Sequence, residues 1–143
     1  EVMGRANAQL HIPIIGNGDL NSPEAVIDFF SRTGCAGAMI GRGALGNPWI
    51  FRQALNVLQG QPCREPSLEE KEDTILRHMR MMVERRGEVH GVKEFRKHLI
   101  WYTKGLRGCT DFRSRIPLWN TVSEMAGGIH EYFQNLKNPP LFS

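Results

Sequence analysis

The sequence predicts an α/β region followed by an all-α region, and three observations support this division. Residues 12–51 hold two short apolar runs, each followed by a glycine-rich turn and then by a helix pattern. The stretch 59–66 is polar and rich in turn residues, as linkers between domains are. Beyond it, apolar residues recur only at the three- and four-residue spacing of helices.

Length and composition limit what the chain can contain. With 143 residues it is too short for a complete (β/α)8 barrel, which needs roughly 250. No apolar run approaches the roughly 20 residues of a membrane span, and the start has no apolar signal region. Cys35, Cys63 and Cys109 are widely spaced, without a CxxC pair. This spacing argues against a disulfide framework and against a zinc site, and it fits a reducing compartment. We expect a cytoplasmic protein without a membrane or metal partner.

Two β/α units are expected in order. The first has a strand over 12–15, bounded by Gly16, and a helix that begins at Ser22 and Pro23 and stops at Gly34. The second has a strand over 36–40 and a glycine-rich loop over 41–46. The dipeptide Asn-Pro at 47–48 is predicted to cap a helix that runs to about residue 58.

Each strand therefore leads into a glycine-rich loop that precedes a helix, an arrangement that binds phosphate. Gly16, Gly18, Gly41 and Gly43 let backbone N–H groups approach an anion, and Arg42 adds a fork of charged donors. A (β/α)8 barrel builds its phosphate site in this way after its last two strands. The predicted fold is the last two β/α units of a TIM (β/α)8 barrel, followed by a C-terminal helical-bundle domain.

The domain prediction assigns residues 1–60 to the barrel part, 61–66 to a linker and 67–143 to the helical domain. Capping boxes at Ser67 and Thr121 begin the first and last helices of that domain. Helices are expected from residue 67 to Gly87, over 89–104, near 111–116 and from 121 to about Leu136.

Positive charge is concentrated in the helical region. The chain carries a net charge of +3, whereas residues 76–115 carry eleven Lys and Arg against four Asp and Glu, a local +7. Residues 1–62 balance at zero. Such a concentration indicates a polyanion partner, although a solvated helix face explains a bare charge count equally well.

Two loop motifs resemble the paired flavin-phosphate motifs of the tRNA-dihydrouridine synthases, bacterial B-type branch. They are Ile-Ile-Gly-Asn-Gly-Asp at 14–19 and Met-Ile-Gly-Arg-Gly-Ala-Leu-Gly-Asn-Pro-Trp-Ile-Phe at 39–51. Residues 92–105 are similar to the Arg-Lys-His…Trp-Tyr-x-Lys-Gly helix of that branch. The resemblance covers nearly the whole chain and implies a C-terminal fragment of such an enzyme.

The resemblance implies a role for each candidate site residue. Asn17, Gly18 and Asp19 would contact FMN, and Gly41 and Arg42 would hold its phosphate. The helical domain would bind tRNA through charge and geometry rather than base edges. Its candidate contacts are Arg96, Lys97, His98, Lys104 and Arg113, of which His98 is as easily a structural histidine.

Four aromatic residues near these motifs are expected to pack rather than bind. Trp49 and Phe51 would pack the last barrel helix instead of touching flavin. Trp101 and Tyr102 could stack on a base, but core packing is the stronger expectation.

The implied reaction is reduction of the C5–C6 double bond of a uridine in tRNA, with FMN as cofactor and NADPH as reductant. The family's proton donor is a cysteine in an Asn-Cys-Gly-Cys-Pro loop, a motif that this chain lacks. No catalytic residue is therefore assigned, and the chain alone is expected to be inactive. Two barrel units leave exposed strand edges, so self-association through them is also expected.

Two other interpretations stay open. One is a different FMN-dependent TIM-barrel oxidoreductase that acts on a small metabolite. The basic helical region argues against it, because a small substrate gives no reason for a local charge of +7. The other is a stand-alone helical RNA-binding module with a structural remnant attached.

Overall fold

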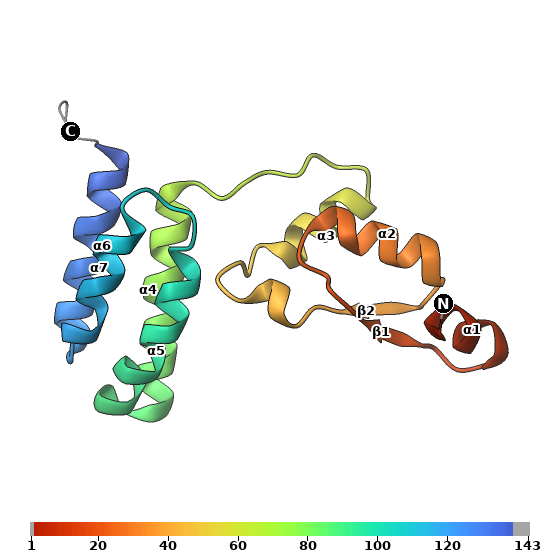
Figure 1. The fold of residues 1–143 in the computed structure, drawn as a ribbon, viewed down its shortest axis with the longest axis horizontal. Coiled ribbons are helices and arrows are strands. Elements are labelled where there is room, and N and C mark those ends of the chain that lie inside the picture. The colour runs from red at the N-terminus through yellow and green to blue at the C-terminus, as the bar shows by residue number, and fades with distance from the viewer. Residues whose placement is uncertain (1, 139–143) are drawn as a thin grey trace. The chain divides into compact units, whose positions relative to one another are not determined.

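The computed structural model describes residues 2–138 and divides the chain into two compact units, Glu1–Glu65 and Pro66–Ser143. We call them the α/β unit and the helical unit (Figure 1). The α/β unit contains α1 (Val2–Gln9), β1 (Ile15–Asn17), α2 (Pro23–Thr33), β2 (Gly37–Met39), the 3-10 turn η1 (Arg42–Ala44) and α3 (Ile50–Leu58). The helical unit contains α4 (Leu68–Arg86), α5 (Glu88–Tyr102), α6 (Cys109–Arg115), the 3-10 turn η2 (Ile116–Leu118) and α7 (Val122–Lys137).

The two strands of the α/β unit are parallel, as expected for consecutive β/α units. Ile15 pairs with Gly37 and Asn17 with Met39, and α2 forms the connection between the strands. The first strand begins at residue 15 rather than at the predicted residue 12. Pairing starts where the Ile14 carbonyl accepts from the amides of residues 36 and 37, and Pro13 just before it has no N–H to donate.

The predicted ends of α2 are confirmed. The Ser22 hydroxyl accepts a hydrogen bond from the Ala25 amide at 3.2 Å, and Pro23 occupies the first turn. Gly34 ends the helix with φ of 62°, a left-handed conformation that glycine adopts without a steric penalty. One cluster of buried apolar side chains in this unit lies beside α2; its members are Leu20, Val26, Phe29, Cys35 and Ala54.

Two expectations for the α/β unit are corrected. Asn47 does not cap α3, because residues 42–49 form a 3-10 turn and further turns in which the Asn47 amide donates to the Ala44 carbonyl. The helix begins at Ile50 without a side-chain cap. Phe51, expected to pack, is 53% exposed, whereas Ile50 beside it is fully buried. The sequence pattern also gave no sign of α1.

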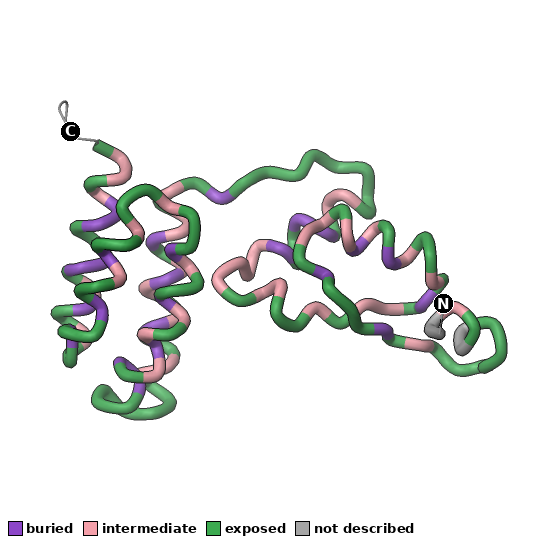
Figure 2. Tube along the Cα trace, in the orientation of Figure 1, coloured by how far each residue is buried: buried purple, intermediate pink, exposed green. Residues whose placement is uncertain are grey.

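The helical unit has a continuous core between its helices. Figure 2 shows buried positions alternating with exposed ones along α4, α5 and α7. The core residues are Ile75, Met79, Val92, Phe95, Leu99, Phe112, Ile116, Trp119, Met125, Ile129, Tyr132 and Phe133. Both predicted capping boxes are confirmed, at Ser67 with Glu70 and at Thr121 with Glu124. These boxes place the starts of α4 and α7.

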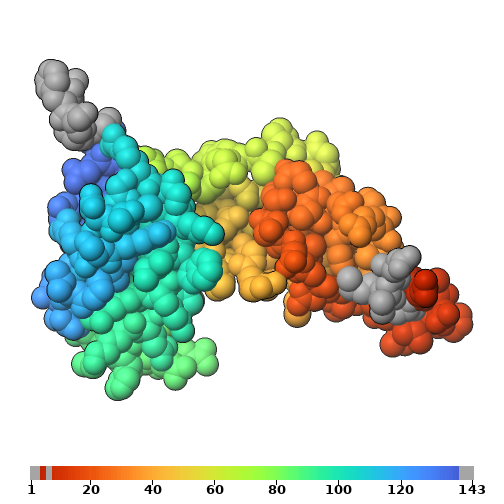
Figure 3. Space-filling view, viewed as in Figure 1, coloured from red at the N-terminus to blue at the C-terminus, as the bar shows by residue number. Residues whose placement is uncertain are grey.

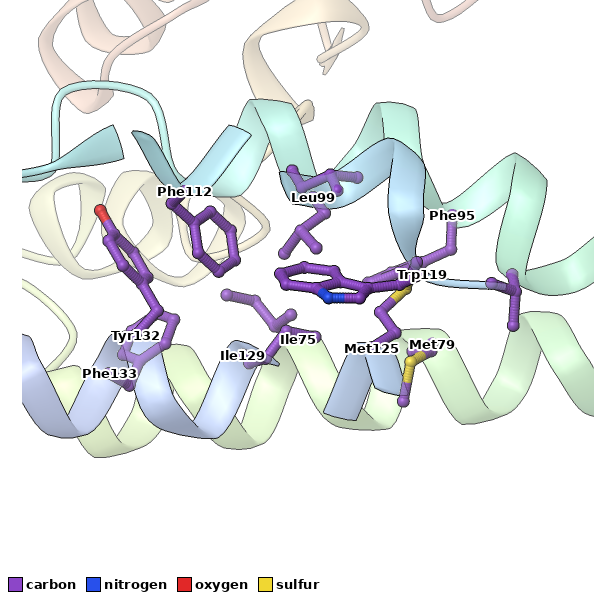
Figure 4. Close-up of a cluster of buried hydrophobic side chains, with 12 residues drawn as sticks. Ile75, Met79, Phe95, Leu99, Phe112, Trp119, Met125, Ile129, Tyr132 and Phe133 are labelled. Carbon is purple, nitrogen blue, oxygen red and sulfur yellow. The ribbon is translucent and has the colours of Figure 1, made fainter. Parts of the chain in front are cut away.

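The indole of Trp119 occupies the centre of this core. Figure 4 shows it between Leu99, Ile129 and Met125, with Phe112 beside it. α7 approaches the ring through Gly128, where an added Cβ would lie 2.2 Å from Trp119 Cζ2. The glycine therefore has a packing role, since only a residue without a Cβ lets the helix come this close.

Trp101 and Tyr102 differ from each other in burial. Tyr102 is half-buried against the core, and its hydroxyl lies 3.1 Å from His78 Nδ1, as core packing predicts. The same expectation is wrong for Trp101, which is 44% exposed. Phe95, Leu99 and Tyr102 share one face of α5, and Trp101 follows Leu99 by two residues, which turns it about 200° away.

Within residues 2–138, no helix combines the length and the apolar composition that crossing a bilayer requires.

Candidate functional site

The five residues predicted to bind a cofactor lie around one pocket. Its volume is about 320 Å³, and its lining residues are Asn17, Gly18, Asp19, Gly41 and Arg42. They meet because β1 and β2 are parallel and in register up to Asn17 and Met39, so both following loops leave the sheet at the same edge. Residues 22 to 25 positions apart in the sequence thus come together.

Glycines shape both the pocket and the contact between its loops. A Cβ added to Gly18 or Gly41 would meet no atom within 4 Å, so the backbone at both positions borders open space. Gly43 differs, because a Cβ there would lie 2.0 Å from the Leu20 carbonyl oxygen. The first two glycines leave room for a ligand, and the third lets the two loops pack against each other.

Arg42 and Asp19 form an ion pair across the pocket. The Arg42 Nη2 to Asp19 Oδ1 distance is 2.7 Å, and the two side chains are 87% and 83% exposed. An ion pair this exposed contributes about 1 kcal/mol or less. The guanidinium can therefore exchange this carboxylate for another anion at little energetic expense.

The donor set fits a phosphate group. It combines the Arg42 guanidinium with the backbone at Gly18 and Gly41, which no side chain covers. The carbonyls of Gly41 and Arg42 already accept hydrogen bonds from the amides of Ala44 and Leu45. None of the five lining residues is aromatic or large and apolar, so the pocket offers no wall for a flavin ring. The described part of the chain also holds no group of three His, Cys, Asp or Glu side chains placed to bind a metal ion.

The two arginines predicted to bind RNA form hydrogen bonds within the helical unit. Arg96 Nη2 donates to the Trp119 carbonyl at 2.7 Å and to Asn120 Oδ1 at 3.0 Å, which ties α5 to the segment before α7. Arg113 Nη2 donates to the Ile100 carbonyl at 2.9 Å, at the C-terminal end of α5. Both guanidinium groups therefore donate to backbone carbonyls of other segments, and the Ile100 carbonyl also accepts from the Thr103 hydroxyl at 3.4 Å.

The other three predicted RNA-binding residues are arranged differently. Lys97 and Lys104 are exposed, and Lys104 Nζ lies 5.9 Å from the centre of the Trp101 ring. His98 is half-buried, with its ring centre 4.9 Å from that of His78. Burial and the neighbouring His78 lower the pKa of His98, which favours the neutral imidazole. The two lysines are therefore the freely accessible cations of the five.

Sequence reasoning left Lys93 off its list of RNA contacts, and it named base stacking for Trp101 but preferred core packing. Lys93 and Trp101 are exposed and lie four residues before and after Lys97. A four-residue spacing places side chains on one helix face, so the pattern was available in the sequence. The net charge of residues 76–115 did not reveal this spacing, because a sum of charges does not distinguish one face of a helix from another.

Comparison with known proteins identifies the class to which this chain is related. The family described as "Dihydrouridine synthase (Dus)" matches residues 4–137. The chain belongs to this family. The family has a TIM-barrel fold, with which two adjacent parallel β/α units are compatible.

Individual relatives carry consistent names. The chain is 35% identical over 135 residues to "tRNA-dihydrouridine synthase B" of Xanthomonas axonopodis pv. citri, covering 94% of this chain and 41% of the relative. It is 33% identical over 134 residues to "tRNA-dihydrouridine synthase B" of Pseudomonas putida, covering 93% and 40%. It is 35% identical over 115 residues to "Probable tRNA-dihydrouridine synthase" of Mycobacterium leprae, covering 80% and 30%. The chain thus spans less than half the length of these relatives.

Proposed function

We propose that this chain is part of a flavin-dependent tRNA-dihydrouridine synthase that reduces the C5–C6 bond of uridine in tRNA, with FMN as cofactor and NADPH as reductant. The chain supplies half of the FMN phosphate site and a tRNA-binding helical domain, over residues 67–143. The observation that carries the proposal is the convergence of Asn17, Gly18, Asp19, Gly41 and Arg42 on one polar pocket, in a chain of this family.

Each residue of the pocket has a defined task in this proposal. Arg42 turns from Asp19 to the phosphate, and the open backbone at Gly18 and Gly41 lets that group approach closely. Asn17 and Asp19 supply hydrogen-bonding groups for the ribityl chain. When bound, FMN supplies hydride transfer, and the protein contributes position and charge.

The chain alone is proposed to be inactive. Cys35 is buried, and neither Cys63 nor Cys109 is near the pocket residues in sequence or among its lining residues. A proton donor must then come from outside this chain. The remaining elements of the proposal are a cytoplasmic location and a tendency to self-associate through the sheet, where Ile15 is 71% exposed.

The helical unit is proposed to bind tRNA mainly through its exposed lysines. Lys97 and Lys104 are accessible for phosphate contacts, whereas Arg96 and Arg113 hold α5 in place and contribute positive potential. His98 contributes a hydrogen bond rather than charge, since its pKa is lowered. The local charge of +7 over residues 76–115 supports this assignment.

Filter binding of unmodified tRNA at 50 and 200 mM salt tests the helical part. For about six phosphate contacts, affinity should fall by roughly a thousandfold between these concentrations. The variant Lys97→Ala should bind more weakly and with a shallower salt dependence. A metabolite-reducing enzyme predicts no tRNA binding at either concentration, and that result would overturn the proposal.

Nuclear magnetic resonance of the 143-residue chain tests the phosphate site. Titration with inorganic phosphate should shift the backbone amide signals of Gly18, Gly41 and Arg42, and Arg42→Ala should weaken the effect. Arg32→Ala is the matched control, because Arg32 also pairs with an exposed aspartate, Asp28, but does not line the pocket. Equal phosphate affinity in both variants would exclude Arg42 as the ligand.

A further inference from the structure

We propose that Trp101 is a stacking platform for an unpaired base of RNA, flanked by lysines that hold the neighbouring phosphates. The inference rests on the proposed tRNA-binding function and adds to it the kind of RNA structure that the helical unit contacts. The surface consists of Lys93, Lys97, Ile100, Trp101 and Lys104, and we call it the Trp101 surface.

The Trp101 surface lies along one side of α5. At 3.6 residues per turn its five positions fall within an arc of about 100°. Lys104 follows the end of the helix, and its amide donates to the Trp101 carbonyl at 3.2 Å, so the chain continues the turn. All five residues are exposed, with Trp101 at 44% and Ile100 at 43%. Figure 3 shows the segment near residue 100, in turquoise, on the surface of the helical unit.

The exposure of Trp101 needs an explanation, because tryptophan is highly buried on average. The inward face of α5 is already filled by Phe95 and Leu99, both fully buried, and by Tyr102. Trp101 is therefore not a core residue displaced by poor packing. It is a large aromatic ring placed on a solvated face, where it adds nothing to the core.

The surroundings of the ring are positively charged. Lys104 Nζ lies 5.9 Å from the ring centre, at the distance of a weak cation–π contact. Among residues 2–138, no carboxylate forms an ion pair with Lys93, Lys97 or Lys104. Glu94, at the edge of the arc, pairs instead with Arg86 at 3.7 Å.

This combination favours a nucleic acid over a basic protein surface as the partner. Two exposed apolar side chains make a small apolar area, and three unpaired lysines around it repel other basic surfaces and attract phosphates. Aromatic rings among basic residues bind single strands, because every unpaired base presents a face for stacking. Paired bases of a duplex have both faces covered, so the proposed ligand is a loop or an unstacked nucleotide.

Fluorescence titration of the 143-residue chain tests the proposal. The probes are a single-stranded RNA octamer, an RNA hairpin of equal charge and unmodified tRNA. Trp101→Ala should weaken octamer binding by about 5- to 150-fold, the range that base stacking represents, without changing the salt dependence. Trp101→Phe should keep most of the affinity. Lys97→Ala should reduce the magnitude of the salt slope by about 0.7 for the single strand.

Controls separate stacking from folding and from the proposed function. Met81→Ala removes an apolar side chain of α4 that is 57% exposed, more than Trp101, and should leave binding unchanged. Thermal unfolding of Trp101→Ala should match that of the parent chain, since the ring is outside the core. If Trp101→Ala binds all three probes like the parent, stacking is refuted and tRNA binding stands. If the parent chain binds no probe at low salt, both proposals fail.

Discussion

The two units of this chain differ in how completely their own residues bury their apolar surface. In the helical unit twelve residues form one buried cluster between four helices. Among the described side chains of the α/β unit the buried cluster has five members, and Ile15 and Met39 on the two-stranded sheet are 71% and 54% exposed. Exposed apolar side chains also lie along α3, at Phe51 and Leu55.

The difference shows what each architecture needs from the rest of a protein. Antiparallel helices joined by short loops can complete a core from one continuous segment. Parallel strands are normally covered on both faces and continued by further strands. A chain that spans 30–41% of the three relatives compared above contains only part of such a sheet. The α/β unit therefore has a formed candidate pocket, but its own residues complete only a small buried core.

Separating the units should produce the largest effect. Residues 66–143 alone should show strong helical circular dichroism and one cooperative thermal transition. Residues 1–65 alone should show no cooperative transition, because its sheet has one uncovered face. A sharp transition in the shorter α/β piece would contradict the comparison.

Filling the space at Gly128 should give the next largest effect. A Cβ there would lie within 2.7 Å of three atoms of the Trp119 ring, so Gly128→Ala should destabilise the helical unit by about 3 kcal/mol. Gly127→Ala is the matched control, since its Cβ would meet no atom and alanine is the better helix former by up to about 1 kcal/mol. Chemical denaturation of both variants gives the two values. Similar stability in both would mean that the core adapts to the added methyl group.

Removing the Arg96 side chain should have a moderate effect on stability. Arg96→Ala loses the hydrogen bonds to the Trp119 carbonyl and to Asn120, an expected loss of about 2 kcal/mol. Lys97→Ala, at the next and exposed position, should change stability by less than about 0.5 kcal/mol. Thermal unfolding together with tRNA binding separates a structural residue from a contact residue. If Arg96→Ala unfolds like the parent chain but binds tRNA poorly, Arg96 is a contact residue.

Lowering the pH should have the smallest effect. Burial lowers the pKa of His78 and, with the help of the neighbouring His78 charge, that of His98. Below about pH 6.5 the unfolded chain takes up protons that the folded chain resists, so stability falls as the pH falls. Thermal midpoints at pH 7.5 and 5.5 should differ less in His98→Gln than in the parent. An identical pH dependence in both would remove His98 from the explanation.

The sequence predicted those parts of the fold that depend on residues close together in the chain. Ser22, Ser67 and Thr121 cap their helices as expected, because each hydroxyl accepts from an amide three residues away. The inward faces of α4 and α5 follow from helical spacing alone. The cap at Asn47 failed, because the chain there forms a 3-10 turn held by bonds of its own.

For the candidate site, the sequence predicted that the two glycine-rich loops would meet. Two strand–loop–helix units and a parallel sheet are enough to bring Gly18 near Gly41, and the structure brings the five cofactor candidates to one pocket. That Arg96 bonds within the helical unit was not predictable, because its partners lie 23 and 24 residues away. Arg96 and Lys97 are adjacent in sequence, yet one bonds to a carbonyl 23 residues away and the other faces solvent.

By itself the sequence determined the order of the elements, most of the helix caps and the two glycine-rich loops, because each depends on interactions within a few residues. Only the tertiary structure decided that the backbone at Gly128 packs against the Trp119 ring, and that Arg96 and Arg113 donate to carbonyls of other segments. These outcomes depend on which side chains from distant segments fit into the same space. Close packing leaves room for one of them, and the others remain on the surface.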